Sequence, residues 1–175
     1  MTPQRPPRRF AKGATMSSYL PENELKEFIA SLPTRRLASS ALIRDPHGRV
    51  LIVEPNYRDG WTLPGGTVEA GEDPRTGCFR EVLEEVGLQL PEGRLLVVAH
   101  GLAAGIWGDS VAFLYDGGVI PEDTEITLQE EELDSHRWAE PGEILGYVGD
   151  RMGRMILSGL EQLETGGVSE FVIGG

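Results

Sequence analysis

Residues 66–88 read GTVEAGEDPRTGCFREVLEEVGL. This stretch fits the pattern G-x5-E-x7-R-E-U-x-E-E-x-G-U, in which U is an aliphatic residue. The fixed positions are Gly66, Glu72, Arg80, Glu81, Val82, Glu84, Glu85, Gly87 and Leu88. At the chain's own Gly and Glu frequencies, a chance match at all of them is expected about once in a million such sequences. The spacing therefore calls for an explanation in structure or chemistry.

The second half of this stretch predicts a helix from Pro74 to Val86. Asp73 is a good N-cap, Pro74 fits the first helical turn where an N–H is not needed, and Gly87 fits the C' position. Apolar residues recur at helical spacing and predict one buried stripe. That stripe consists of Cys78, Phe79, Val82, Leu83 and Val86.

Three glutamates, Glu81, Glu84 and Glu85, are expected together on the other face of this helix. Like charges at this spacing destabilise an isolated helix by about 0.2 to 0.5 kcal/mol per pair, so a positive partner is expected nearby. A merely solvated acidic face would not require the adjacent Arg80 or the preceding loop residue Glu72. Hard cations such as Mg2+ prefer oxygen ligands and are often held by a few carboxylates together with substrate phosphate.

These residues resemble the Nudix box, the signature of hydrolases that act on a nucleoside diphosphate linked to another moiety. The resemblance implies an α+β fold, a Nudix-like α/β/α sandwich with a mixed, partly antiparallel sheet. It implies that Glu81, Glu84 and Glu85 bind Mg2+, with Mn2+ as the alternative ion, and that the carbonyl of Gly65 completes the set of ligands. It also implies that Arg80 pairs with Glu72 and so fixes the loop against the helix.

The implied chemistry is attack of water on phosphorus, and it needs a base that accepts the proton of that water. Metal ions that bridge the phosphates neutralise the charge that develops. In the family the base is a box glutamate, here Glu81, or a glutamate on a distal loop. The distal candidates are Glu130, Glu131 and Glu132, and Glu131 is predicted as the catalytic one among them.

Composition limits the remaining function classes. The chain has 175 residues, of which 39% are hydrophobic, and this suits one globular domain with short extensions. Its net charge of −12 argues against nucleic acid or an anionic membrane as a partner. The single cysteine, Cys78, excludes an internal disulfide. Without a secretory segment or an apolar run of spanning length, the expected location is the cytoplasm.

Four segments are expected along the chain. Residues 1–18 are basic and Pro-rich and are expected to be a disordered extension, and residues 19–36 hold a short amphipathic helix. Residues 37–165 form the hydrolase domain, and residues 166–175 form a C-terminal tail. Strands are predicted at Leu37–Ile43, Arg49–Glu54, Leu95–Ala99, Ser110–Tyr115 and Ser135–Ala139, and a closing helix at Tyr147–Leu163.

Substrate contacts are expected from aromatic and basic residues in the loops around the box. Tyr57 and Arg58 precede it, and Trp107 lies in a later Gly-flanked turn. Trp61 is assigned to the core instead. The expected partner is a small-molecule diphosphate or nucleotide, and a homodimer is left open.

The most favoured activity is a MutT-like one, in which a nucleoside triphosphate gives a nucleoside monophosphate and pyrophosphate. Markers of the groups acting on ADP-ribose, diadenosine polyphosphates or NADH are absent downstream of the box. Nucleotide sugars and prenyl diphosphates remain alternatives. A non-catalytic ligand-sensing domain is disfavoured by the intact box, and a diphosphate isomerase is disfavoured because Cys78 lies inside the helix.

Overall fold

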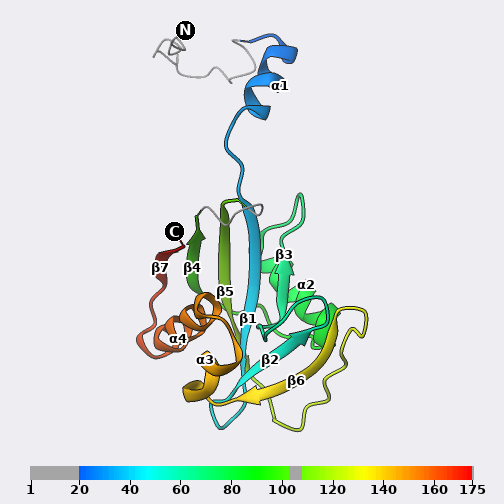
Figure 1. The fold of residues 1–175 in the computed structure, drawn as a ribbon, viewed down its shortest axis with the longest axis vertical. Coiled ribbons are helices and arrows are strands. Elements are labelled where there is room, and N and C mark those ends of the chain that lie inside the picture. Colours follow the sequence, from blue (N-terminus) through cyan, green and yellow to red (C-terminus); the bar gives the residue numbers. More distant parts are fainter. Residues whose placement is uncertain (1–19, 103–107, 175) are drawn as a thin grey trace. The chain divides into compact units, whose positions relative to one another are not determined.

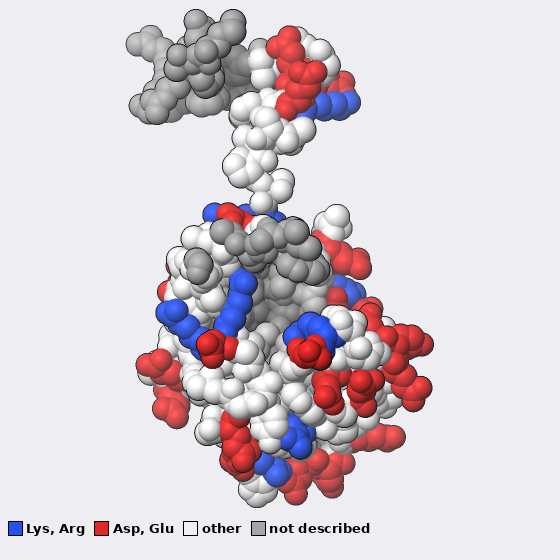
Figure 2. All heavy atoms as spheres, in the orientation of Figure 1, with Lys and Arg blue, Asp and Glu red and all other residues white. Residues whose placement is uncertain are grey.

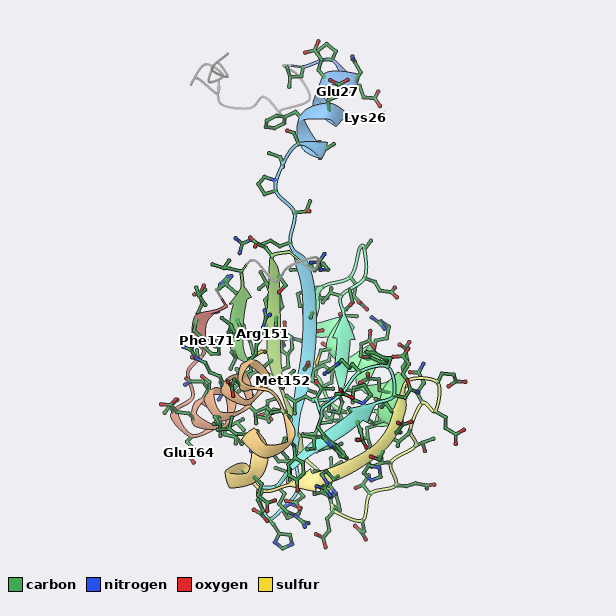
Figure 3. All side chains as sticks on the ribbon, in the orientation of Figure 1. Lys26, Glu27, Arg151, Met152, Glu164 and Phe171 are labelled. Atoms are coloured by element: carbon green, nitrogen blue, oxygen red, sulfur yellow. The ribbon has the colours of Figure 1, made fainter. Side chains whose placement is uncertain are left out.

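The computed structural model describes residues 20–102 and 108–174. The chain divides into two units, Met1–Thr34 and Arg35–Gly175. The described part of the first unit contains the helix α1 (Glu22–Ala30), in which no residue is buried. Lys26, labelled in Figure 3, lies on this helix and forms an ion pair with Glu22 one turn earlier. Within the described ranges no helix is long and apolar enough to cross a membrane.

Within the described residues of the second unit, seven strands form one sheet in the order β6-β2-β1-β5-β4-β7, with β3 paired to β1 (Figure 1). The β1–β5 and β4–β7 pairs are parallel and the others are antiparallel. The strands are β1 (Arg36–Arg44), β2 (Val50–Pro55), β3 (Gly65–Thr67), β4 (Leu95–Gly101), β5 (Ser110–Val119), β6 (Leu133–Ala139) and β7 (Ser169–Ile173).

A tight turn joins the first two strands, β1 and β2, into an antiparallel pair. The Asp45 carboxylate accepts hydrogen bonds from the backbone N–H groups of His47 and Arg49, each at 2.9 Å. Gly48 has a φ of 84°, a conformation that favours glycine. The chain therefore reverses within four residues, and β1 and β2 lie next to each other in the sheet.

Helices cover both faces of the sheet. Helix α2 (Pro74–Val86) packs on one face, chiefly against β1 and β3. Helix α4 (Asp150–Thr165) packs on the other face, against β4 and β5, and α3 (Ile144–Tyr147) precedes it (Figure 1). Each helical layer has its own apolar cluster. The predicted α+β class with a mixed sheet between helices is confirmed.

Three segments differ from the sequence prediction. The predicted helix over Tyr147–Leu163 is two helices, because extended backbone at Val148 and Gly149 separates α3 from α4. The segment 166–175, expected as a tail, contains β7, whose Phe171 and Ile173 pack on the α4 cluster. The strand β3 was not predicted from the sequence, because two of its three residues are glycines and it has no alternating hydrophobic pattern. The four segment boundaries stay a prediction.

Candidate active site

Helix α2 has the predicted bounds and caps. Asp73 accepts hydrogen bonds from the N–H groups of Arg75 and Thr76, at 3.0 and 3.2 Å. Its bonds to Thr76 hold the pKa of the Asp73 carboxyl below its usual value. At the other end Gly87 is left-handed and its N–H donates to the carbonyl of Leu83. These two caps fix where the helix begins and ends.

The predicted buried stripe of α2 is wrong at Leu83, and so is the shared outer face of the three glutamates. Leu83 is 48% exposed, whereas Glu85 is only 5% exposed. The helical repeat explains this exchange. Glu85 follows the buried Cys78 by seven residues and Val82 by three, so it lies on the stripe that faces the sheet. One carboxylate of the cluster therefore points into the protein, between α2 and β3.

The environment of Glu85 is unfavourable for a negative charge. Its Oε2 accepts a hydrogen bond from the backbone N–H of Gly65 at 2.7 Å. Burial raises the pKa of Glu85 to about 7, and the nearby charges of Glu81 and Glu132 act in the same direction. A carboxylate in this position gains stability from any cation that reaches it.

The two glycines of β3 are explained by their close neighbours. A Cβ on Gly66 would lie 2.6 to 2.8 Å from the carboxylate atoms of Glu81. Gly65 has a φ of 140°, and a Cβ there would lie 2.2 Å from the carbonyl oxygen of Ser39. Only glycines allow the strand to lie this close to both β1 and α2. In this structure the backbone N–H of Gly65 donates to Glu85. The role of the Gly65 carbonyl as a metal ligand stays a prediction.

Arg80 is the positive group that the acidic cluster requires. Its Nε and Nη2 donate to the two carboxylate oxygens of Glu72, at 2.9 and 3.1 Å. Its Nη1 donates to Glu81 at 3.0 Å and to Glu84 at 2.8 Å. These bonds raise the pKa of the Arg80 guanidinium and lower the pKa of Glu72. Arg80 thus joins the loop to the helix and also offsets part of the negative charge of the acids.

The carboxylates suit a hard divalent cation by their chemistry. Among the residues that the structure describes, no three His, Cys, Asp or Glu side chains are gathered at metal-binding spacing. The carboxylates of Glu81 and Glu84 bind Arg80, whereas the carboxylate of Glu85 binds Gly65, so the three carboxylates have different partners. Glu81 also has a pKa raised by burial. The buried Glu85, the half-buried Glu81 and the exposed Glu84 form an oxygen donor set of the kind that Mg2+ or Mn2+ prefers.

The loop before β6 is fastened to the end of α2. The N–H groups of Thr127 and Gln129 donate to the carbonyls of Val86 and Glu85, at 3.2 and 3.0 Å. The charge of Glu132, at the end of this loop, acts on both Glu81 and Glu85. The backbone carbonyl of Glu131, in the same loop, accepts a hydrogen bond from the Asn56 side chain at 3.0 Å. The distal base, with Glu130, Glu131 and Glu132 as its candidates, stays a prediction.

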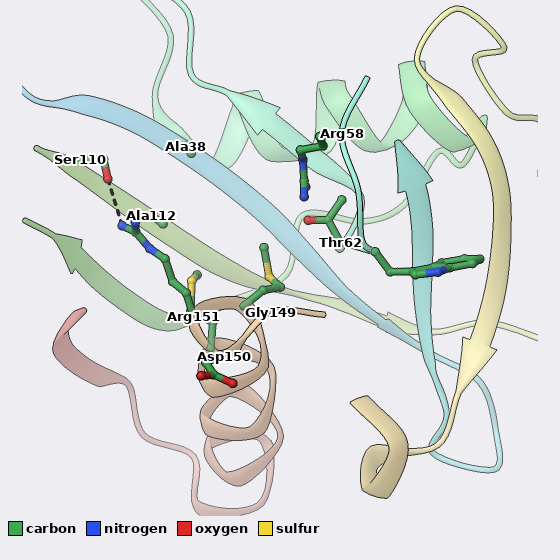
Figure 4. Close-up of a pocket in the computed structure, with 11 residues that line it drawn as sticks. Ala38, Arg58, Thr62, Ser110, Ala112, Gly149, Asp150 and Arg151 are labelled. Atoms are coloured by element: carbon green, nitrogen blue, oxygen red, sulfur yellow. Dashed lines mark hydrogen bonds between the residues drawn. The ribbon is translucent and has the colours of Figure 1, made fainter. Parts of the chain in front are cut away.

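A cavity of about 420 Å³ lies on the α4 face of the sheet (Figure 4). Arg58 lies on one side of it and Arg151 on another, where the Arg151 guanidinium donates to Ser110 Oγ at 3.2 Å (Figure 4). Gly101 makes room for that guanidinium, because a Cβ at this position would lie 1.7 Å from Arg151 Nη2. The lining residues are Ala38, Arg58, Trp61, Thr62, Ser110, Ala112, Gly149, Asp150, Arg151, Met152 and Met155.

Arg58 connects this cavity to the acidic cluster. It lines the cavity, and its positive charge partly offsets the rise that burial causes in the pKa of Glu85. Tyr57 is 66% exposed and does not line the cavity, and Trp107 lies outside the described residues. Trp61 packs against the core as expected and also lines the cavity. The substrate roles of Tyr57, Arg58 and Trp107 stay predictions.

Sequence reasoning missed Arg151 and Ser110 as cavity residues. They are 41 positions apart in the chain and meet only because α4 packs across β4 and β5. No local pattern marks either of them. The acidic surface was predictable: acidic side chains gather on the side of the unit that carries α2 and the loop before β6 (Figure 2).

Comparison with known proteins gives consistent matches. A sequence model of the NUDIX domain matches residues 34–157. A MutT-like protein from Streptomyces ambofaciens is 30% identical over 65% of this chain and 70% of its own length. A CMP-5'-(N-acetyl-N-hydroxy-3-aminopropyl)phosphonate hydrolase from Streptomyces rubellomurinus is 31% identical over 70% of this chain and 59% of its own length. The crystal structure of a MutT protein from Methanosarcina mazei superposes with a TM-score of 0.65 at 25% identity, covering 77% of this chain and 99% of that one.

Proposed function

The chain belongs to the Nudix hydrolase family, whose members act on diphosphate-containing substrates, and from this premise we propose that it is a Mg2+-dependent pyrophosphohydrolase of nucleoside triphosphates or related nucleoside diphosphate derivatives. With a triphosphate, the products are a nucleoside monophosphate and pyrophosphate. The observation that carries this proposal is Glu85, a buried carboxylate with a raised pKa beside two further acids. A non-catalytic ligand-sensing domain, the alternative within the family, would not need a buried carboxylate with a raised pKa.

The acidic cluster would hold the metal through Glu81, Glu84 and Glu85. When bound, a divalent ion neutralises the phosphate oxygens and lowers the pKa of a bound water. The intact chain contributes the placement of these carboxylates: Gly65 orients Glu85, and Arg80 ties Glu81 and Glu84 to the loop that carries Glu72. Mn2+ is the expected substitute for Mg2+.

Water adds across the diphosphate link in this proposal. Its oxygen bonds to one phosphorus, the bridging oxygen leaves with the other phosphate, and the proton of the water passes to a glutamate. Glu81 and the distal residues Glu130, Glu131 and Glu132 are the candidates. Glu132 is favoured among the distal ones because its charge acts on both Glu81 and Glu85. A base at this position is worth about 100- to 10,000-fold in rate.

The cavity on the α4 face would hold the nucleoside or other leaving portion of the substrate. Arg58 lies between this cavity and Glu85, where it can meet a phosphate. Trp61 offers an aromatic surface, and Arg151 with Ser110 offers hydrogen-bond donors. The resemblance to a CMP-phosphonate hydrolase favours a nucleotide linked to another group as the second candidate substrate. The homodimer and the cytoplasmic location expected from the sequence stay predictions.

The test is a hydrolysis screen with Mg2+ or Mn2+ over nucleoside triphosphates, dinucleotides, nucleotide sugars, CMP-linked phosphonates and prenyl diphosphates. Carrying it out in 18O-labelled water identifies which phosphorus is attacked. Turnover of a nucleoside triphosphate to its monophosphate supports the first candidate. Turnover of another class alone would replace the substrate assignment, and no turnover of any class would overturn the proposed activity.

A matched pair of variants tests the choice of base. Glu132→Gln is expected to reduce kcat about a hundredfold, whereas Glu131→Gln retains most activity. The reverse result would restore Glu131 as the distal base. If neither substitution matters, Glu81 and Glu130 become the remaining candidates.

A further inference from the structure

Ser39 carries a buried hydroxyl that has no visible structural purpose. Its side chain is 1% exposed. Within the residues that the structure describes, Ser39 Oγ and Arg44 Nε are the buried side-chain polar atoms without a hydrogen-bond partner. A buried hydroxyl without a partner destabilises a folded protein, and alanine has nearly the same shape. A serine at this position therefore calls for a functional explanation.

The alternation of β1 places this hydroxyl on the catalytic face. Ala41 and Ile43 of the same strand belong to the cluster under α2, and Leu42 belongs to the cluster under α4. Side chains two residues apart in a strand share a face, so Ser39 points with Ala41 and Ile43 toward α2. The cavity residue Ala38 points the other way.

The strand register brings Ser39 close to Glu81. Ser39 lies directly opposite Gly66 in the antiparallel pair of β1 and β3. Opposed Cβ positions in such a pair are about 4.5 to 5.5 Å apart and lie on the same face. A Cβ on Gly66 would lie within 2.8 Å of all three carboxylate atoms of Glu81. Because Gly66 has no side chain, nothing on that residue separates the Ser39 hydroxyl from this carboxylate.

Glu81 has room for a second donor. Its Oε1 accepts one bond from Arg80 at 3.0 Å, and within the described residues no donor to its Oε2 is recorded. A carboxylate can accept about four hydrogen bonds. The Ser39 hydroxyl lies on the strand side of this carboxylate and has no other partner.

We propose that Ser39 is a positioning residue for Glu81: its hydroxyl donates to the Glu81 carboxylate through one bridging water and fixes the orientation in which Glu81 serves the reaction. This role rests on the proposed function for its effect on turnover. It does not depend on which substrate is used, and its effect on Glu81 extends to the binding of a divalent ion.

The decisive comparison is between Ser39→Thr and Ser39→Val. These two variants have the same shape and differ only in the hydroxyl. The threonine variant is expected to keep a kcat about tenfold above that of the valine variant, with similar KM values. Equal kcat values for the two would show that the hydroxyl has no role and would overturn the proposal.

A second variant guards against a packing artefact. Ser39→Ala is expected to lower kcat about tenfold and to weaken Mn2+ binding, measured by calorimetry without substrate, by a similar factor. The melting temperature of the metal-free variant should be unchanged or higher, because Ser39 Oγ makes no direct hydrogen bond to the protein and its burial costs stability. A fall of several degrees would mark Ser39 as structural and contradict the proposal. Ser40→Ala, on the opposite face of the same strand, is the control and should change none of these values.

The Mn2+ measurement separates the two proposals. If the wild-type chain binds Mn2+ but hydrolyses no substrate in the screen, the proposed function fails, and the Ser39 proposal still stands or falls on the Mn2+ affinity of Ser39→Ala. If Ser39→Ala binds Mn2+ as the wild type does and retains full activity, the positioning role fails while the proposed function is untouched.

Discussion

The two faces of the sheet are built from different kinds of sequence information. On the α2 face, the acids and Arg80 come from one stretch of 23 residues and are joined to each other by ion pairs. On the α4 face, the cavity is lined by residues from four separated segments between Ala38 and Met155. The comparison indicates that the proposed metal site is mostly local in sequence, whereas the cavity is assembled by long-range packing.

The largest effect is expected on the α2 face, from Glu85→Gln. The substitution keeps the volume and removes a metal-binding charge, which is worth several kcal/mol of transition-state stabilisation. We expect kcat to fall about a thousandfold or more. Steady-state kinetics with Mg2+ checks this, with circular dichroism as the control for folding. Near-normal turnover would show that the α2 face is not the catalytic one.

The same substitution should change how stability depends on pH. The pKa of Glu85 is raised to about 7, so the folded protein binds a proton that the unfolded chain releases near its usual value of 4.5. Glu85 therefore lowers stability as pH rises from about 4.5 to 7. In metal-free protein, Glu85→Gln is expected to gain up to about 3 kcal/mol above pH 7 and nothing near pH 4. Urea unfolding at several pH values in EDTA measures this, and a constant difference would contradict the assigned burial effect.

Arg80→Ala should have a smaller effect on activity, because Arg80 acts through the acids that it holds. Loss of such a supporting contact typically costs about 10- to 100-fold in activity or metal affinity. Arg80→Lys should restore little, since an ammonium cannot replace the paired contact with Glu72. Arg75→Ala is the matched control on the same helix, where Arg75 lies over the Tyr115 ring. If Arg80→Ala retains full activity, the loop with Glu72 is held in another way.

The cavity should give the smallest effect, and on a different parameter. Arg151→Met removes a guanidinium from the cavity wall and is expected to raise KM about tenfold with little change in kcat, as loss of one charge-assisted hydrogen bond to a substrate would. Arg154→Met is the control, because Arg154 lies about one turn after Arg151 on α4 and stacks over the Phe171 ring. A fall in kcat instead of a rise in KM would contradict the assignment of substrate binding to the α4 face and of catalysis to the α2 face.

Much of the α2 face could be predicted because its determinants are local. Asp73, Pro74 and Gly87 specify the ends of α2, and the box spacing identifies Arg80 with its partner Glu72. The burial of Glu85 was missed because a glutamate at an inward-facing position contradicts the usual hydrophobic pattern. Such an exception is typical of functional sites.

The remaining features depend on contacts that no local pattern encodes. Strand β3 forms only because Gly65 and Gly66 can approach β1, and β7 forms by pairing with β4 from a distant part of the chain. The Arg151–Ser110 contact requires α4 to lie across two strands. The sequence could therefore predict the helix and most strands, but not the cavity.

The most direct test is a crystal structure with Mn2+ and a non-cleavable nucleoside triphosphate analogue. The account predicts anomalous density for at least one ion within about 2.3 Å of carboxylate oxygens of Glu85 and Glu81 or Glu84, with phosphate oxygens on its other side. Arg80 should then have exchanged at least one of its bonds to Glu81 and Glu84. Bound analogue without any ion beside α2, or with the ion held elsewhere, would contradict the central claim.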